Sequence, residues 1–330
     1  MVTPVQDQPV RWALVGMGNI ACKRVGPAIR SSSRGVLYAC MSRDPRAKRS
    51  QIEALRPQQV YSDFDRLLND PNVDAVYLAT PVFLHAPLTM KALEAGKDVL
   101  VEKPMALNAT EAEAMCGLAE QLGRRLAVAY YRRFWPRFQL VRDLLQQGDL
   151  GEPVLVRMAL HSWFAPENQR SWRSDPALAG GGVLNDVGSH RLDLLAWWLG
   201  LLEKLVATAS TRVQEYEAED STGVLMTLED GVPCTASFQW NSKTWTDEIH
   251  VVGTEGKITL HPCDGEEVTI TLGRDTEQQR VPKSGNAHAP LIEDFSTAIL
   301  ENRPPRFNGR DGIKASQIMD AIFQSSDCAR

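Results

Sequence analysis

The order of apolar and polar residues changes character near residue 130. Before this point, short apolar runs alternate with helical stretches, which is typical of βαβ units and a parallel sheet. The runs contain few polar residues, as is typical of strands that are covered on both faces. The predicted strands are Arg11–Val15, Val36–Met41, Ala75–Ala79, Asp98–Val101 and Arg125–Ala129.

Polar residues and prolines predict where elements of this first part begin and end. Asp44-Pro45 indicates a helix start, with Asp44 as N-cap and proline in the first helical position. Asn108 followed by Glu111 indicates a second capped start. Thr80-Pro81 and Lys103-Pro104 each end a strand and begin a loop.

Beyond residue 130 apolar and polar residues alternate over longer runs, which predicts antiparallel strands with one solvent-facing side. Asp230-Gly231, between two of these runs, predicts a two-residue hairpin turn. Helices are predicted at Pro136–Gln147, Asp186–Leu199 and Ile313–Asp327. The predicted strands are Val154–Phe164, Lys204–Val213, Val224–Leu228, Pro233–Trp240, Glu248–Val252 and Val268–Leu272.

These elements predict an α/β chain of two domains. Residues 1–128 are expected to form a Rossmann-type, doubly wound parallel sheet. Residues 129–330 are expected to form an α+β domain with an open, mainly antiparallel sheet, whose last helix can pack back on the first domain. A wide sheet with apolar residues on both sides needs a partner for its outer face, so we expect a homodimer or homotetramer.

The composition is that of an ordinary folded chain. Of 330 residues, 43% are apolar and 23% are charged, which excludes general disorder. The net charge of −5 and the scattered basic residues leave no basic surface for nucleic acid or an anionic membrane. The apolar stretches fall short of the ~20 residues that span a bilayer, and the N-terminus has no secretion signal. We therefore expect a cytoplasmic protein.

The cysteines have no C-x-x-C spacing, so we interpret them as mostly buried thiols in a reducing compartment and expect no metal site. They are Cys22, Cys40, Cys116, Cys234, Cys263 and Cys328.

A glycine-rich turn follows the first predicted strand. Gly16-Met17-Gly18-Asn19-Ile20-Ala21 fits G-x-G-x-x-A, a form of the dinucleotide-binding fingerprint. Gly16 permits a tight turn, Gly18 lets the backbone approach a pyrophosphate, and Ala21 lets the next helix pack closely. The alternative is a tight strand–helix turn without a ligand, but the position between strand and helix near the chain start favours a cofactor site.

The end of the second strand indicates which dinucleotide binds. Sites for NAD place an acidic residue there to bind the ribose 2′-hydroxyl, whereas sites for NADP place a basic one. Ser42 and Arg43 stand at this position, and Arg43 can hold a 2′-phosphate bidentately. Asp44 is the competing candidate, but it lies later and is already interpreted as an N-cap. The residues favour NADP over NAD.

Two further groups carry candidate chemistry. Glu102-Lys103-Pro104 ends the fourth predicted strand, and ligands of open α/β sheets bind at the carboxyl ends of strands. Lys103 can therefore bond a substrate oxygen and move its proton, or it is a solvated loop lysine. In the predicted helix, Asp186, His190 and Asp193 share one face. A carboxylate beside an imidazole suits acid–base catalysis; the alternative is a helix cap and a structural histidine.

Taken together, Gly16-x-Gly18-x-x-Ala21, Glu102-Lys103-Pro104 and Asp186-x-Gly188-x-His190 resemble the motifs of the glucose–fructose oxidoreductase, inositol dehydrogenase and rhizopine catabolism (Gfo/Idh/MocA) family. The resemblance covers essentially the whole chain in motif order, spacing and layout. The Glu-Lys-Pro motif is highly specific in this setting and the glycine motif is not. The family often has a cis Lys-Pro bond, which fits Lys103-Pro104.

The resemblance implies an oxidoreductase that moves a hydride between a nicotinamide and a carbon of a sugar, polyol or related alcohol. Lys103 would polarise the reacting oxygen, His190 would be the general acid/base, and Asp186 would bind substrate hydroxyls and assist His190. Thr80, Glu102 and Lys103 would join the glycine turn at the cofactor. Relatives that hold NAD tightly and cleave glycosidic bonds are an alternative, as is a non-catalytic dinucleotide-binding sensor.

Other positions carry weaker signals. Tyr131 stands where the family commonly has Asn, which puts the substrate contacts there in doubt, and Arg132 follows it. Trp172 and Arg173 precede the Gly180 run and are candidate pocket residues; the alternative is a sheet-packing tryptophan and a surface arginine. His85 is interpreted as a capping or packing residue, and the remaining histidines as strand or loop residues without partners: His161, His250, His261 and His288.

Overall fold

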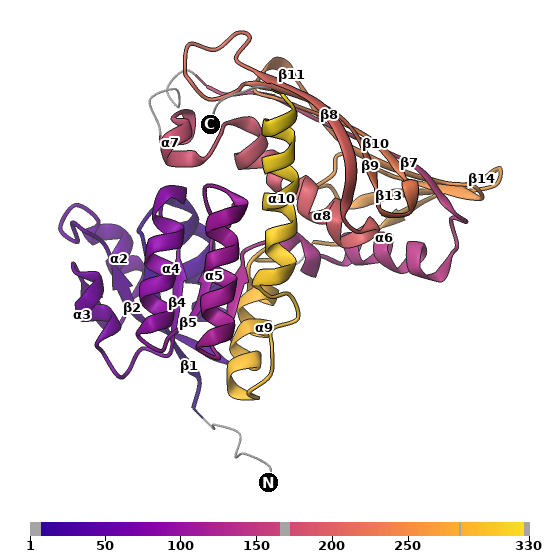
Figure 1. The fold of residues 1–330 in the computed structure, drawn as a ribbon. Coiled ribbons are helices and arrows are strands. Elements are labelled where there is room, and N and C mark those ends of the chain that lie inside the picture. Colours follow the sequence, from indigo (N-terminus) through magenta and orange to yellow (C-terminus); the bar gives the residue numbers. More distant parts are fainter. Residues whose placement is uncertain (1–7, 166–171, 284, 327–330) are drawn as a thin grey trace. The chain divides into compact units, whose positions relative to one another are not determined.

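The computed structural model describes residues 8–165, 172–283 and 285–326 (Figure 1). Two compact units make up the chain. The first combines Met1–Tyr131 with Ser284–Ile313, and the second combines Arg132–Lys283 with Lys314–Arg330. The chain therefore returns to the first unit after the last strand of the second. Cys328 and the end of the helix predicted at 313–327 lie outside the described residues.

The first unit is built on a six-stranded sheet in the order β3-β2-β1-β4-β5-β6. All neighbouring strands are parallel, which confirms the predicted Rossmann-type sheet. The third strand was not predicted, because it is three residues long and its side chains are largely exposed. The strands are β1 (Val10–Val15), β2 (Gly35–Met41), β3 (Gln59–Tyr61), β4 (Ala75–Leu78), β5 (Asp98–Val101) and β6 (Leu126–Val128).

Helices connect and cover these strands, and Figure 1 shows α4 and α5 side by side. Asn108 caps α5 by accepting the backbone N–H of Glu111 at 2.9 Å, as predicted. The prediction for Asp44 was wrong in position: its carboxylate accepts the N–H of Ala47, and the helix begins later, at Arg49. The helical elements are η1 (Ala21–Val25), α1 (Gly26–Ser31), α2 (Arg49–Leu55), α3 (Phe64–Leu68), η2 (Val82–Leu84), α4 (His85–Glu94), α5 (Ala109–Gln121) and α9 (Ala289–Leu300).

Helix α9 completes the first unit, although it lies far along the chain. The indole N–H of Trp12 on β1 donates to Ser296 at 3.0 Å, and its ring packs on Phe295. Both residues of α9 are fully buried. Helix α9 therefore forms part of the core of the first unit, although it comes after the second sheet in the sequence. Local sequence patterns did not predict this packing.

The second unit is built on an eight-stranded sheet in the order β14-β13-β12-β11-β7-β10-β9-β8. All neighbouring pairs are antiparallel except β10 and β7, which confirms a mainly antiparallel sheet. Strands β12 and β14 were not predicted. The strands are β7 (Pro153–Trp163), β8 (Leu202–Ser210), β9 (Ser221–Leu228), β10 (Pro233–Gln239), β11 (Asn241–Gly253), β12 (Gly256–Leu260), β13 (Glu267–Leu272) and β14 (Asp275–Arg280).

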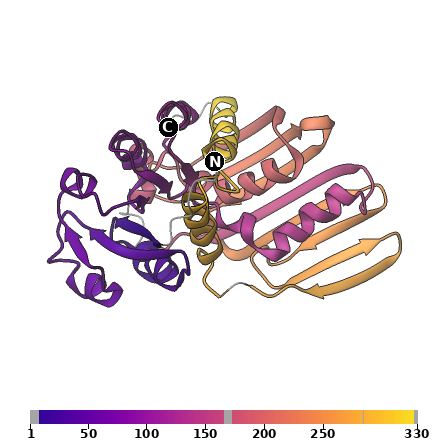
Figure 2. The same cartoon turned by 90° about the horizontal axis from the view of Figure 1, so that it is seen from below.

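One face of this sheet is covered by helices, and Figure 2 shows α6 lying over the strands. The indole N–H of Trp198 on α8 donates to the carbonyl of Phe138 on α6 at 3.1 Å, which joins the two helices. Helix α10 begins in the first unit and continues into the second. The helical elements are η3 (Tyr131–Phe134), α6 (Pro136–Gln147), η5 (Trp172–Ser174), α7 (Pro176–Ala179), η6 (Leu184–Gly188), α8 (Ser189–Leu199), η7 (Glu229–Gly231) and α10 (Gly309–Ser325).

The hairpin between β9 and β10 forms where the sequence predicts it, but its turn is longer than the two residues expected: Glu229–Gly231 forms a 3-10 turn, and the N–H of Leu228 donates to the carbonyl oxygen of Val232 at 2.8 Å. Asp230 and Gly231 both have positive φ angles, of 61° and 77°, as a tight hairpin turn requires. On the outer face of the sheet, Val206 and Leu225 are direct cross-strand partners and are 70% and 57% exposed. The predicted homo-oligomer stays a prediction. Within the described parts of the chain, no helix combines the length and apolar character needed to span a membrane.

A buried ion pair fixes α8 against the segment that precedes α6. The Asp193 carboxylate accepts from the Nε and Nη2 of Arg133 at 2.6–3.1 Å. The side chains of Arg133 and Asp193 are only 2% and 1% exposed. Asp193, which the helical spacing had grouped with Asp186 and His190, is therefore held in the interior of the second unit.

We expect Asp193→Asn to reduce the free energy of unfolding by about 3–5 kcal/mol, because it leaves the Arg133 guanidinium buried without a counter-charge. Urea unfolding followed by tryptophan fluorescence measures this loss. The matched control is Glu53→Gln, which removes the exposed partner of Arg49 and should leave the transition unchanged. An Asp193→Asn protein as stable as the parent would contradict the importance of the pair.

Candidate functional site

The glycine turn after β1 has the geometry that its sequence predicts. Gly16 has a φ of +91°, and an added Cβ would lie 2.5 Å from the carbonyl oxygen of Ala79. No side chain fits at Gly16 unless the backbone at Ala79, directly after β4, moves. A Cβ on Gly18 would meet nothing within 4 Å, so space lies open beside this residue. Met17 and Ala21 are buried, whereas Asn19 and Ile20 are exposed.

The turn leads directly into a helical segment, in which Asn19 and Ile20 are already α-helical. Ala21–Val25 forms a π-helical turn, and α1 begins only at Gly26. A Cβ on Gly26 would lie 2.6 Å from the side chain of Leu55, so the small residue permits close packing on α2. Turns of this kind occur frequently at functional sites.

The end of β2 presents a basic side chain to solvent. Arg43 is exposed and makes no ion pair or hydrogen bond with the residues that the structure describes. Asp44 is engaged in its own turn, since its carboxylate accepts the N–H of Ala47 at 3.0 Å. The hydroxyl of Ser42 donates to the carbonyl oxygen of Asp44. The guanidinium of Arg43 is thus the group available to a ligand at this position.

His85 joins the loops that follow β4 and β5. Its Nε2 lies 3.0 Å from the carbonyl oxygen of Thr80, and its Nδ1 lies 2.9 Å from that of Pro104. The Lys103-Pro104 peptide bond is cis. Burial lowers the pKa of His85, although these two carbonyls oppose the shift. The interpretation of His85 as a packing residue was therefore incomplete, because its ring bridges two candidate cofactor loops.

Glu102 and Lys103 follow β5 in a polar cluster. The Glu102 carboxylate accepts the hydroxyl of Tyr77 at 2.8 Å and the backbone N–H of Lys103 at 3.2 Å. His288 lies 3.5 Å from the same carboxylate, so its interpretation as a residue without a partner was wrong. Burial and the nearby Glu102 charge raise the pKa of Tyr77 well above its ordinary value. Lys103 itself is half-buried.

In the second unit, Asp186 lies in a π-helical turn that leads into α8. Leu184–Gly188 forms this turn, and α8 continues from Ser189. Glu219 holds its start, because its carboxylate accepts the backbone N–H groups of Gly182 and Leu184 at 2.6 and 3.0 Å. A carboxylate on free N–H groups at a helix start is stabilised by hydrogen bonds and by the helix dipole.

Asp186 has a cationic neighbour. The Nε of Arg173 lies 3.6 Å from its carboxylate, and the Arg173 guanidinium lies 4.6 Å from the ring centre of Trp172. The side chains of Arg173 and Asp186 are partly exposed, whereas His190 is buried. Trp172, Arg173 and Asp186, which the sequence analysis names as substrate candidates, therefore contact one another in a row.

A network of buried charges holds α8 behind His190. Arg191 donates to Asp247 on β11 at 2.7 Å and to Asp264 at 3.3 Å. Asp264 also accepts both Nε and Nη2 of Arg132. Burial would raise the pKa of Asp264, but the two guanidinium groups outweigh it and hold the pKa well below its ordinary value. Arg132, a sequence candidate for substrate binding, belongs to this network; its contact with substrate stays a prediction.

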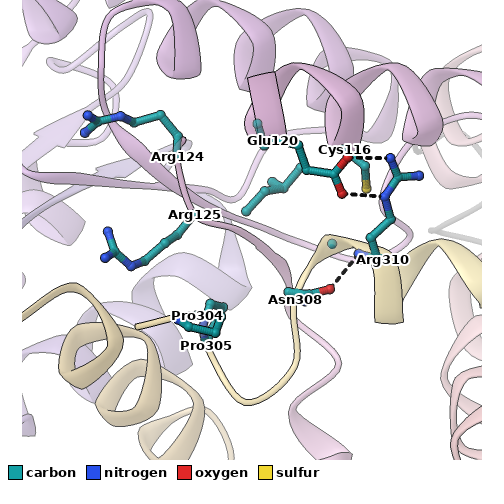
Figure 3. Close-up of a pocket in the computed structure, with 11 residues that line it drawn as sticks. Cys116, Glu120, Arg124, Arg125, Pro304, Pro305, Asn308 and Arg310 are labelled. Atoms are coloured by element: carbon teal, nitrogen blue, oxygen red, sulfur yellow. Dashed lines mark hydrogen bonds and ion pairs between the residues drawn. The ribbon is translucent and has the colours of Figure 1, made fainter. Parts of the chain in front are cut away.

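A separate cavity of about 150 Å³ lies between the end of α5, the start of β6 and the start of α10 (Figure 3). Its charged groups already have partners. Arg310 binds Glu120, at 2.7–2.8 Å, and Arg125 donates to Asp98 at 3.1 Å. The cavity adjoins the amino end of β6, whereas the sequence candidates of the first unit follow the carboxyl ends of strands. We therefore assign no part of the candidate site to it.

The residues of the first unit fit a bound dinucleotide. The open space beside Gly18 suits a diphosphate, and the exposed Arg43 suits an anionic ribose substituent. The buried hydroxyl of Thr80 has no hydrogen-bond partner among the described residues, so it can bond a ligand at the end of β4. No cluster of three or more His, Cys, Asp or Glu side chains in the described ranges is placed to hold a metal ion.

The five cysteines in the described ranges are free thiols. Burial raises the pKa of Cys40, Cys116, Cys234 and Cys263 to about 12 in each case, so these thiols are protonated at neutral pH. Cys22 is partly buried, and its pKa is also raised.

Three residues of the site were missed by sequence reasoning: Tyr77, Glu219 and His288. Each acts on a motif that lies far away in the chain. In the sequence, Tyr77 is one residue of an apolar strand, with nothing to indicate a role for its hydroxyl. Glu219 lies in a charged segment that matches no motif. Only the fold places these side chains next to Glu102 and the turn before Asp186.

Family models match both units of the chain. Residues 10–130 match the oxidoreductase family with an NAD-binding Rossmann fold, and residues 138–259 match the GFO/IDH/MocA C-terminal domain. These matches agree with the two sheets described above. They include the Gly16–Ala21 turn and Glu102-Lys103 in the first match, and Asp186 and His190 in the second.

Relatives extend over nearly the whole chain. The 1,5-anhydro-D-fructose reductase of Ensifer adhaerens is 28% identical, over 92% of each protein. The D-xylose 1-dehydrogenase (NADP(+)) 2 of Haloferax volcanii is 26% identical, over 96% of this chain and 97% of the relative. The aldose-aldose oxidoreductase of Caulobacter crescentus, solved with glycerol, has a TM-score of 0.89 and 26% identity, and covers 98% of this chain and 99% of its own. The chain described here belongs to the GFO/IDH/MocA family of oxidoreductases.

Proposed function

We propose that this protein is an NAD(P)-dependent dehydrogenase or reductase that moves a hydride between nicotinamide and a carbon of a sugar, polyol or related alcohol or ketone. The observation that carries the proposal is the open glycine turn after β1, combined with Lys103 at the end of β5, in a chain of this oxidoreductase family. The names of the reductase and the xylose dehydrogenase support a sugar-like substrate.

The first unit supplies the residues that would hold the cofactor. The N–H groups and open space at Gly16–Ala21 would bind the diphosphate, and Thr80 would bond a ribose or amide group. When bound, the nicotinamide supplies or accepts the hydride. The exposed Arg43, with Asp44 engaged elsewhere, favours NADP, and a relative named for NADP(+) supports this preference.

The protein's own groups would handle the proton. Oxidation of an alcohol requires a base for the hydroxyl proton, and reduction of a ketone requires the same group as an acid. Lys103 would donate a hydrogen bond to the reacting oxygen and polarise it. His190 would take up or return the proton. Asp186, whose carboxylate lies 3.6 Å from the Nε of Arg173, would bind substrate hydroxyls.

A substrate screen tests the reaction class. A panel of sugars, polyols and small diols, followed by nicotinamide absorbance with both cofactors, is expected to show net reduction or oxidation of the cofactor. A redox-neutral glycosidase would instead cleave a glycoside while its bound cofactor shows no net change, and a sensor would bind the dinucleotide without turning over any compound.

Replacing Lys103 tests its role. Lys103→Ala should lower kcat by about 10²–10⁴-fold, the usual range for loss of a positioned proton-transfer group, and leave the dissociation constant of the cofactor nearly unchanged. Steady-state kinetics and cofactor titration by fluorescence measure the two effects. Lys91→Ala is the control, since Lys91 is exposed and paired with Asp65. Equal losses of cofactor binding and turnover in Lys103→Ala would contradict the role.

Replacing Arg43 tests the cofactor preference. Arg43→Ala should raise the KM for NADP about 10–100-fold relative to that for NAD, because a charge-assisted bidentate contact with the phosphate is lost. Arg49→Ala is a matched control, because the Arg49 guanidinium is nearby in sequence but bound to Glu53. If the ratio of the KM values for NADP and NAD is unchanged in Arg43→Ala, another residue determines which cofactor is preferred.

A further inference from the structure

A buried carboxylate, a phenol and an imidazole form a cluster next to Lys103. Glu102 is 8% exposed and His288 is 2% exposed. The hydroxyl of Tyr77 lies 2.8 Å from Oε1 of Glu102, and Nε2 of His288 lies 3.5 Å from the same oxygen. These side chains come from β4, from the end of β5 and from the residue just before α9.

The surroundings of His288 point to a role beyond packing. Its ring packs on Tyr131 with a centroid distance of 4.5 Å. Neither ring nitrogen makes a hydrogen bond of ideal length with the described residues. Buried imidazoles ordinarily have such a bond, because an unsatisfied polar group in the interior is costly. The carboxylate of Glu102, at an ion-pair distance, is the group that compensates His288.

The charge of Glu102 depends on these neighbours. Burial by itself would raise the pKa of Glu102, because a carboxylate loses its hydration in the interior. His288, the Tyr77 hydroxyl and the charge of Lys103 outweigh burial and hold the pKa below its ordinary value. Glu102 is therefore ionised at neutral pH. Loss of a neighbour that favours the ionised form moves its protonation to higher pH.

We propose that His288 keeps Glu102 ionised beside Lys103 and is thereby a positioning residue for hydride transfer. This inference rests on the function proposed above, in which Lys103 contacts the substrate oxygen. An ionised Glu102 accepts the backbone N–H of Lys103 and attracts its ammonium group. A protonated Glu102 loses this attraction, so one of the forces that position the ammonium group is removed.

Other titratable groups also face Glu102. Tyr77 approaches from β4, Lys103 from the loop after β5 and His85 from α4, where the charge of Glu102 acts on its imidazole. Tyr131 of η3 contacts the ring of His288. Variants of His288 leave all four in place, so a change in pH dependence reports on the contact between His288 and Glu102.

Two substitutions separate charge from packing. His288→Phe keeps an aromatic ring against Tyr131 but removes the nitrogen that faces Glu102. His288→Gln keeps an N–H donor that can reach the carboxylate. His250→Phe is the control, since His250 lies on β11 of the other unit and contacts Thr259. Profiles of kcat/KM against pH, with cofactor titrations, are measured for each variant.

For His288→Phe we expect the acid limb of kcat/KM to move up by about one pH unit, because Glu102 then takes up its proton at higher pH. Cofactor affinity should stay within about twofold of the parent, since His288 is not among the residues assigned to the cofactor. His288→Gln should restore the acid limb to within about half a pH unit. An equal loss of kcat in both variants with an unmoved acid limb would overturn the proposal.

A double substitution tests whether His288 acts through Glu102. In a Glu102→Gln protein, the further change His288→Phe should alter kcat less than about twofold, because the ionisation it supports is already gone. If His288→Phe costs the same factor in both backgrounds, the two residues act independently and the proposal fails.

A titration without turnover separates this inference from the proposed function. Glutamate labelled with ¹³C at the carboxyl carbon reports the protonation of Glu102 by NMR, with Glu102→Gln to assign its signal. We expect its midpoint to rise in His288→Phe, and an unchanged midpoint overturns the inference. A parent protein that shows this titration but turns over no sugar with either cofactor would overturn the proposed function, while the effect of His288 on Glu102 would stand.

Discussion

Buried carboxylates organise each of the two groups of candidate residues. In the first unit, the Glu102 carboxylate contacts the Tyr77 hydroxyl, the backbone N–H of Lys103 and the His288 imidazole. In the second, Glu219 binds the amides at the start of the turn that carries Asp186. A carboxylate in the interior is tolerated only when donors surround it, so each one fixes several segments at once. The positions of the candidate catalytic residues depend on this constraint.

Helix α8 shows how the same interactions provide rigidity. Two residues that follow His190 are bound to different parts of the second unit: Arg191 reaches Asp247 and Asp264, and Asp193 accepts from Arg133. A group that exchanges protons with a substrate must be held in one geometry to be effective. Charge pairs suit this purpose because they fix direction as well as distance, whereas apolar packing on the other side of α8 fixes mainly the distance.

The parts of the fold that the sequence revealed are those with strong local signals. Five strands of the first sheet were predicted because they are continuous apolar runs, and the turn at Asp230-Gly231 because only certain residues accept its backbone. Strand β14 was missed because all its side chains are exposed, so it has no apolar pattern. The π-helical turn at Leu184–Gly188 was also missed, since residue spacing does not separate it from an α-helical turn. His288 could not be linked to Glu102, because a contact between distant segments leaves no local pattern.

The two edge strands of the eight-stranded sheet, β14 and β8, have features that oppose pairing with a strand of another molecule. At one edge, β14 is polar and fully exposed, with Asp275, Glu277 and Arg280 among its six residues. At the other, the side chain of Ser325 on α10 accepts the backbone N–H of Ala207 on β8. Charged or covered edges discourage the strand-to-strand growth that leads to aggregation. The charged strand at one edge and the engaged amide at the other therefore oppose edge-on addition of further strands, and association of copies through the outer face stays a prediction.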